Sequence, residues 1–237
     1  MGSETPTRLG NQEIYERIYA AIGERRLLPG TKLSEEKLAR AFHASRTRIR
    51  EVLMRLSQEL IVELRPNRGA YVARPSQEDL RDVFAVRRAL ERAIAVELAE
   101  RYSGHPLDAM RDHLDAEARA RSVGDRQALA RLTGEFHVRL AGTTGNRLYS
   151  DSVRRLVALT GLVIAQYDAA ASSACPEHEH GDIVVAIESG DAQRAEQLML
   201  THLRHVETGI RPPPAGAGRV DFERIFGLAP GATPEPT

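Results

Sequence analysis

Residues 28–56 read LPGTKLSEEKLARAFHASRTRIREVLMRL, and this stretch decides the fold of the N-terminal part. Pro29 and Gly30 end a preceding helix, which is marked by an isoleucine every four residues. Ser34 and Ser45 each stand where a side-chain oxygen can cap a new helix. The last helix carries its apolar residues at helical spacing: Ile49, Val52, Leu53 and Leu56. The stretch therefore predicts three short helices in succession.

After the third helix the pattern changes to two short β-prone runs. The runs at 61–64 and 70–72 flank a turn that contains Pro66, Asn67 and Gly69. Such a turn between two apolar runs is typical of a hairpin. Three helices followed by a hairpin predict a winged helix-turn-helix.

The third helix of this arrangement would enter the major groove of DNA with its N-terminus first. Arginine suits guanine or phosphate, and hydroxyl side chains suit phosphate oxygens. The hairpin tip would reach the minor groove or the backbone. The predicted contacts are Ser45, Arg46, Thr47, Arg48, Arg50, Arg68 and Gly69. A solvated basic helix face is the alternative interpretation of these residues.

The order of three sequence blocks resembles the GntR family of regulators. The blocks are residues 28–39, residues 45–53 and residues 66–72, and all three follow in the family's order and spacing. The family usually has proline where Arg48 stands, and the extra arginine should add phosphate affinity. The resemblance implies a homodimer that reads a short palindromic operator in double-stranded DNA.

The rest of the chain shows helical spacing only. We expect a DNA-binding domain over 8–74, a helical domain over 77–210 and a Pro/Gly-rich tail over 211–237. The expected helices of the second domain are 77–102, 106–121, 125–141, 146–170, 176–189 and 191–209. The predicted fold class is mainly α, with an N-terminal winged helix-turn-helix and a C-terminal all-helical bundle.

Charge is divided between the two parts, although the net charge of the chain is zero. Of 33 basic and 33 acidic residues, residues 1–74 hold 14 basic and 9 acidic ones. The remainder holds 19 basic and 24 acidic residues. A basic N-terminal part joined to an acidic C-terminal part indicates nucleic-acid binding by the first domain alone.

Composition also bears on location. Cys175 is the single cysteine, which excludes an internal disulfide and suits a reducing compartment. We find neither a signal pattern nor an apolar run of about 18 residues. The expectation is a cytoplasmic protein without membrane contact.

Three histidines suggest a ligand site in the second domain. His180 and His202 lie ten residues before and twelve residues after Gly190, which joins their helices. At about 1.5 Å rise per residue, both reach the same height of an antiparallel pair. His137 would complete a set for a divalent transition metal, first of all zinc. Separate surface or core histidines are the alternative.

Residues 77–209 are similar to the effector-binding domain of the FCD branch of GntR regulators. The resemblance implies a metal set of one aspartate and three histidines, and the histidines correspond to His137, His180 and His202. Thr133 stands where the aspartate is expected, so the metal would be weakly held, completed by water, or absent. Glu135 cannot replace the aspartate easily, because it points away from His137.

Arg87 shares a helix face with Leu90, Ile94 and Leu98, so we expect it inside the bundle. A buried arginine needs an anion. One interpretation is a small acidic effector held by Arg87 and the metal, with Thr133 at the same site. The other is an ion pair with Glu91, one turn further on.

These observations predict a transcriptional repressor or activator, not an enzyme, whose affinity for DNA depends on a small carboxylate metabolite. Two alternatives stay open. Three histidines and a water also make a hydrolytic zinc site, and an architectural DNA-binding protein would need no ligand.

Overall fold

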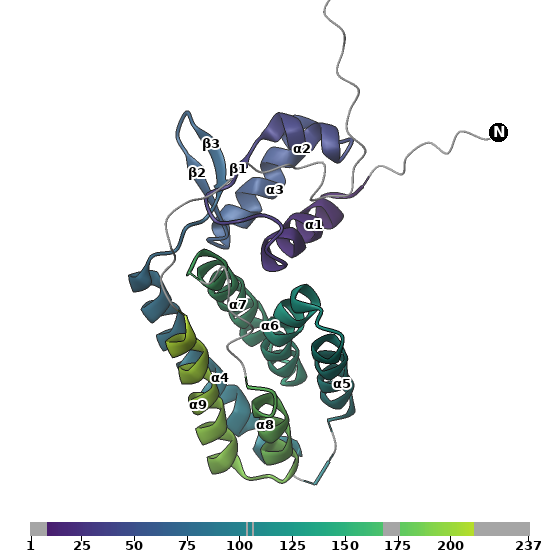
Figure 1. Cartoon of the computed structure of the whole chain (residues 1–237), viewed down its shortest axis with the longest axis vertical. Helices are drawn as coiled ribbons and strands as arrows, with labels where there is room; N and C mark the ends of the chain where they lie inside the picture. Colours follow the sequence, from purple (N-terminus) through teal and green to yellow (C-terminus); the bar gives the residue numbers. More distant parts are fainter. Residues whose placement is uncertain (1–8, 103, 106, 168–175, 211–237) are drawn as a thin grey trace, which may run out of the picture. The chain divides into compact units, whose positions relative to one another are not determined.

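The computed structural model describes residues 9–102, 104, 105, 107–167 and 176–210, which form two compact units (Figure 1). The first unit ends at Ala73 and the second begins at Arg74. The expected tail over 211–237, Cys175 and the expected helix end at 168–170 lie outside the described residues.

The first unit contains three helices and a small sheet. The loop from Pro29 to Thr31 is tied to the sheet, since Gly30 N donates to Val72 O at 2.8 Å. The elements are α1 (Asn11–Gly23), β1 (Lys32–Leu33), α2 (Glu35–Ala41), α3 (Arg46–Gln58), β2 (Val62–Arg65) and β3 (Gly69–Val72).

Both predicted serine caps are present. Ser34 Oγ accepts from Lys37 N, and Ser45 Oγ accepts from Arg48 N, each at 3.4 Å. These bonds satisfy backbone donors that the first turn of a helix leaves free. One face of α3 is fully buried against α1 and α2: Ile49, Val52, Leu53 and Leu56.

The sheet has a third strand that the sequence pattern does not reveal. The strand order is β1-β3-β2 and all pairs are antiparallel, with Leu33 opposite Ala70 and Leu64 opposite Ala70 on the other side. Strand β1 is only two residues long, so no alternation of side chains can be seen in it. It fixes the start of α2 beside the hairpin.

The second unit is all-helical, as expected. Its helices are α4 (Gln77–Tyr102), α5 (Asp108–Ser122), α6 (Arg126–Thr143), α7 (Arg147–Tyr167), α8 (Glu179–Glu188) and α9 (Ala192–Gly209). Asp125 and Asp191 cap α6 and α9 through bonds of 2.9 Å to backbone N–H groups. Together with the first unit, this confirms the predicted fold class.

The core of the second unit takes most of its residues from α4, α6, α8 and α9, and α5 and α7 complete it. Helix α4 packs along α9, and α8 and α9 form a hairpin around Gly190. Gly190 has φ +75°, a conformation that glycine adopts readily at the end of a helix. Phe84 and Phe136 are fully buried there. This packing brings polar residues of all six helices into the interior.

Candidate DNA interface and candidate metal centre

The start of α3 presents polar side chains on its exposed face. Arg46, Thr47 and Arg50 are exposed, whereas Arg48 is half-buried. Because Arg46 and Arg50 are one turn apart, both project from the same side of the helix. Both side chains are exposed, so they are available to a ligand of the first unit.

Arg48 is engaged within the chain. Its Nε donates to Asn11 Oδ1 at 2.6 Å, and its Nη2 donates to Leu9 O. Asn11 Nδ2 in turn donates to Glu51 Oε2 at 2.9 Å. The residue that departs from the usual family pattern thus ties the start of α1 to α3, a role that we did not expect from the sequence.

Arg50 forms a two-pronged ion pair with Glu35 at the first turn of α2. Arg50 Nε lies 3.0 Å from Glu35 Oε1, and Arg50 Nη2 lies 2.8 Å from Glu35 Oε2. Hydrogen bonds from Arg50, helped by the charges of Arg50 and Arg46, hold the pKa of Glu35 below its usual range. Glu35 is therefore an ionised group beside the predicted DNA contacts.

The hairpin places Arg68 at its tip, where the side chain is exposed. Asn67 and Gly69 have φ of 59° and +92°, values that favour asparagine and glycine. Tyr71 Oη donates to Arg68 O at 3.3 Å, and Arg65 lies over the Tyr71 ring. The tip is thus held in a defined turn.

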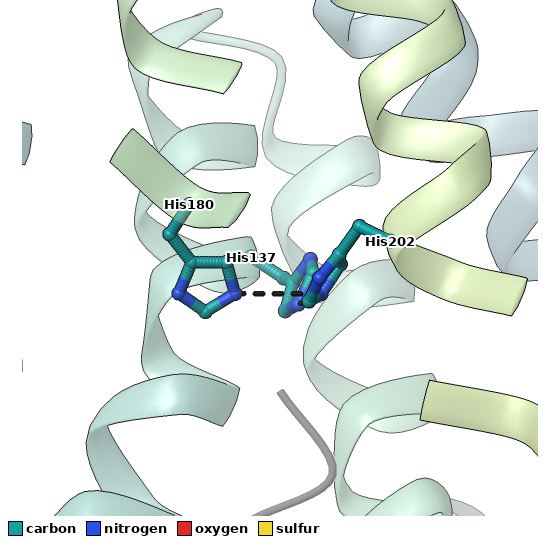
Figure 2. A group of neighbouring side chains, drawn as sticks. All are labelled: His137, His180 and His202. Carbon is teal, nitrogen blue, oxygen red and sulfur yellow. Dashed lines mark hydrogen bonds between the residues drawn. The ribbon is translucent and has the colours of Figure 1, made fainter. Parts of the chain in front are cut away.

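The three histidines singled out in the sequence converge in the second unit. His137 comes from α6, His180 from α8 and His202 from α9, and Figure 2 shows the imidazole rings turned toward one another. His202 Nε2 lies 3.2 Å from His137 Nε2 and 3.4 Å from His180 Nε2. All three side chains are buried.

Each imidazole is held at its other nitrogen by a glutamate. His137 Nδ1 donates to Glu91 at 2.5 Å, His180 Nδ1 to Glu117 at 2.9 Å, and His202 Nδ1 to Glu179 at 2.8 Å. A proton on Nδ1 leaves a lone pair on Nε2. Three Nε2 lone pairs therefore point into one small space.

The protonation states of these histidines and of Glu117 favour metal binding. Burial lowers the pKa of His137 to about 3 and that of His202 to about 4, so both rings are neutral at pH 7. Burial alone would raise the pKa of Glu117, but hydrogen bonds from His113 and His180 outweigh it and hold the pKa at about 2. Neutral imidazoles beside ionised carboxylates are the state in which histidine binds metals.

The fit to a metal ion can be tested on the nitrogen distances. Two acceptor nitrogens that face each other at 3.2–3.4 Å repel unless a proton or a cation lies between them. Two nitrogens bound to one tetrahedral zinc ion lie roughly 3.3–3.4 Å apart. The donor set, the two distances from His202 and the carboxylates behind the rings fit a divalent transition metal.

Thr133 does not point a free hydroxyl at this cluster. Its Oγ1 donates to the carbonyl oxygens of Leu129 and Ala130, at 3.0 and 3.2 Å in its own helix. Glu135, which we judged a poor replacement ligand, pairs with Arg131 and lies 3.8 Å from Arg139. The cluster thus consists of three histidines, and neither Thr133 nor Glu135 belongs to it.

Arg87 is buried beside the cluster and is only partly satisfied. Its Nε donates to Glu91 Oε1 at 2.7 Å, and its Nη1 donates to Thr160 Oγ1 at 3.2 Å. Its Nη2 is buried and has no hydrogen-bond partner within the part of the chain that the structure describes. The ion pair with Glu91 is present, and one donor remains available for an anion.

Two of the three supporting glutamates were missed in the sequence. Glu117 lies on the buried face of α5 with Met110, His113 and Ala120. This helical spacing could have revealed it, because a charged residue on an apolar face needs a buried partner. Glu179 precedes His180 directly, and nothing in its sequence context distinguishes it from an exposed acidic residue.

Comparison with known proteins agrees with this architecture. Residues 11–72 match the model of the gntR family of bacterial regulatory proteins, and residues 82–205 match the FCD domain. Among the described residues, no helix combines the length and apolarity that crossing a membrane requires.

Similar proteins cover most of the chain. The HTH-type transcriptional repressor RspR of Escherichia coli K12 is 27% identical over 87% of this chain and 91% of its own length. The regulator LutR of Bacillus subtilis is 27% identical over 76% and 92%. A GntR regulator from Rhodococcus sp. RHA1 has a similar structure, with a TM-score of 0.75 and 26% identity over 84% and 96%. The chain therefore belongs to the GntR family of transcriptional regulators and combines its DNA-binding domain with an FCD domain.

Proposed function

We propose that the chain is a metabolite-responsive repressor that binds its operator as a homodimer. The FCD domain would sense a small carboxylate through Arg87 and a divalent transition metal held by His137, His180 and His202. The convergence of three Nε2 atoms, each backed by a glutamate at Nδ1, is the observation that carries this proposal. Two relatives, RspR and a regulator of D-xylose utilisation in Paenarthrobacter nicotinovorans, are described as repressors.

The buried charges around the cluster favour a divalent ion. Glu91, Glu117 and Glu179 all have pKa values below their usual range, and Arg87 is the cation among them. Counted without the histidines, three negative charges and one positive charge leave a formal charge of −2, which is costly in the interior unless a cation offsets it. A bound divalent ion would supply a Lewis-acidic position for an anionic oxygen.

The effector would be a carboxylate because the available donors require an anion. The Nη2 of Arg87 is a buried donor, and burial of an unsatisfied donor costs about 1–3 kcal/mol. An oxygen of the effector would satisfy it beside the metal. Thr160 holds the guanidinium in place from α7 and also donates to Leu156 O at 2.8 Å.

Helix α4 would carry the response to the DNA-binding domain. It begins at Gln77, directly after the junction at 74–76, and it carries both Arg87 and Glu91. An effector that changes the contacts of Arg87 acts on the helix to which the first domain is joined. Coupling of this kind is a free energy shared between two sites.

A hydrolase remains a weaker candidate on this structure. Such an enzyme needs a carboxylate base that faces the metal-bound water. Glu91, Glu117 and Glu179 instead accept hydrogen bonds from the imidazole Nδ1 atoms. The family assignment also favours regulation, because GntR regulators are generally not enzymes.

Arg46 and Arg50 provide the test of the DNA interface, whose other proposed contacts are Ser45, Thr47, Arg48, Arg68 and Gly69. Arg46→Ala and Arg50→Ala should each weaken operator binding by about 1–3 kcal/mol if a base contact is lost. The operator can be isolated by selection from random duplexes and binding measured by fluorescence anisotropy. Arg40→Ala, at an exposed position of α2, is the control. Unchanged affinity in both variants would refute the assignment of α3.

The homodimer follows from the symmetry of the proposed operator. A protein with two-fold symmetry requires two half-sites related by the same symmetry. Light scattering of the protein alone and with the selected duplex should give two chains per particle. A single chain in both samples would contradict the proposal.

Thr133→Asp tests the position where the family resemblance implies an aspartate. The substitution places a carboxylate one turn before His137 on α6, so it should raise metal retention during dialysis against a chelator. It should also weaken the effector response, since the carboxylate competes for the open position. Thr201→Asp, an exposed change beside His202, is the matched control. Equal metal loss from Thr133→Asp and the unmodified protein would show that residue 133 does not face the metal.

A further inference from the structure

The pairing of Glu35 with Arg50 has a particular geometry. Glu35 binds the edge of the guanidinium that contains Nε and Nη2, through two bonds of 3.0 and 2.8 Å. Arginine has a second edge, formed by Nη1 and Nη2, that also binds two acceptors in one plane. This outer edge is the one that the pairing leaves for a second ligand. The side chain of Arg50 is 65% exposed, whereas that of Glu35 is 28% exposed.

A second arginine of α3 lies within electrostatic reach of the same carboxylate. The charge of Arg46 acts on Glu35 in addition to the bonds from Arg50. An acidic group in a DNA-binding surface repels phosphates and reduces the attraction that arginines exert on any duplex. Phosphate contacts position a protein without reading sequence, while bidentate contacts to guanine read it. An ion pair that weakens phosphate contacts and orients an arginine toward guanine increases the selectivity of DNA binding.

We propose that Glu35 is a specificity-determining positioning residue, which holds Arg50 so that its outer edge meets a guanine and limits its binding to phosphates. This inference rests on the proposed role of α3 as the helix that enters the groove. Glu35 acts through Arg50 and does not itself contact a base.

Glu35→Gln is the direct test, because it removes the charge and keeps the shape of the side chain. Binding of the full-length protein should be measured on the selected operator and on a scrambled duplex of equal length, over a range of salt concentrations. Affinity for the scrambled duplex should rise. The slope of log affinity against log salt concentration should steepen by about one unit for this duplex. The ratio of operator to scrambled affinity should fall roughly five- to tenfold, as expected for a weakened base contact.

Glu36→Gln is the matched control. Glu36 lies in the same first turn of α2, and its ion pair is with Arg40, at 3.8 Å on the surface. Its substitution changes the net charge and the helix N-terminus in the same way as Glu35→Gln. The ratio of the two affinities should therefore stay unchanged in Glu36→Gln.

A double variant separates the positioning role of Glu35 from the proposed role of α3 as the helix that enters the groove. In an Arg50→Ala background, Glu35→Gln should no longer change the affinity ratio, because the residue that it positions is absent. We expect the ratio of operator to scrambled affinity to fall in Glu35→Gln and to stay unchanged in Glu36→Gln. In the Arg50→Ala background, Glu35→Gln should cause no further change of this ratio. An unchanged ratio in Glu35→Gln, or the same fall with Arg50 absent, would overturn the role of Glu35. Normal operator affinity of both Arg46→Ala and Arg50→Ala would instead refute the assignment of α3.

Should Glu35→Gln unfold, Glu35→Asp serves in its place. It keeps the charge but withdraws the carboxylate by one methylene group. The salt slope should then stay unchanged while the affinity ratio falls. A preserved ratio would contradict the positioning role.

Discussion

Replacing His180 with alanine is expected to remove the metal and the response to the effector together. His180 contributes one of three nitrogens, and its loss leaves two ligands beside the space vacated by an imidazole. Metal content of the purified protein, measured by elemental analysis after mild chelation, should fall from about one ion per chain to a background level. Operator binding in the absence of effector should persist, because the DNA-binding unit folds around its own core.

His178→Ala is the matched control for this experiment. His178 lies two residues before His180, and its side chain is exposed. The same chemical change at this position should leave the metal content unaltered. Equal metal content in His180→Ala and His178→Ala would mean that the three histidines do not form a metal site.

Arg87→Lys is expected to abolish the effector response without loss of the metal. Lysine keeps the positive charge beside Glu91, which avoids leaving a buried carboxylate unpaired. It lacks the planar fork, so it cannot bind Glu91, Thr160 and an effector at once. Loss of a hydrogen bond to a charged group costs about 1.5–3 kcal/mol, which weakens effector binding roughly 10- to 150-fold.

The measurement for Arg87→Lys is a thermal-shift screen against small mono- and dicarboxylates, followed by operator anisotropy with any compound that stabilises the protein. Arg81→Gln is the control, since Arg81 is exposed on the same helix. A carboxylate that stabilises both variants and the unmodified protein equally would show that Arg87 does not hold the effector.

The fold could be predicted from local signals to a large extent. Serine and aspartate caps, helical spacing and the glycine turns define helices that the structure contains, and Ser34 and Ser45 make the expected cap bonds. Strand β1 could not be predicted, because two residues carry no alternation. Its formation depends on pairing with β3, which is distant in the sequence.

The metal centre could be predicted in part. The position of His180 and His202 on either side of Gly190 follows from helix geometry. The partners of these rings come from other helices, and nothing local connects Glu117 on α5 with His180 on α8. Such tertiary partners are set by packing and not by spacing along the chain.

The DNA interface shows the same limit. Arg48 and Arg50 look alike in the sequence, as basic residues at the start of one helix. In the structure one binds Asn11 of α1 and the other binds Glu35 of α2. Side chains of the same kind thus acquire different neighbours, and only their positions on the helix surface were predictable.

The central claim is that His137, His180 and His202 together hold one metal ion. X-ray absorption spectroscopy of the full-length protein, loaded with one equivalent of zinc, tests it most directly. The account predicts a first shell with three imidazole nitrogens at about 2.0–2.1 Å, completed by oxygen. The imidazole signal should be lost in His180→Ala and preserved in His178→Ala. A shell of oxygen ligands alone, or a spectrum identical in His180→Ala and the unmodified protein, would contradict the account.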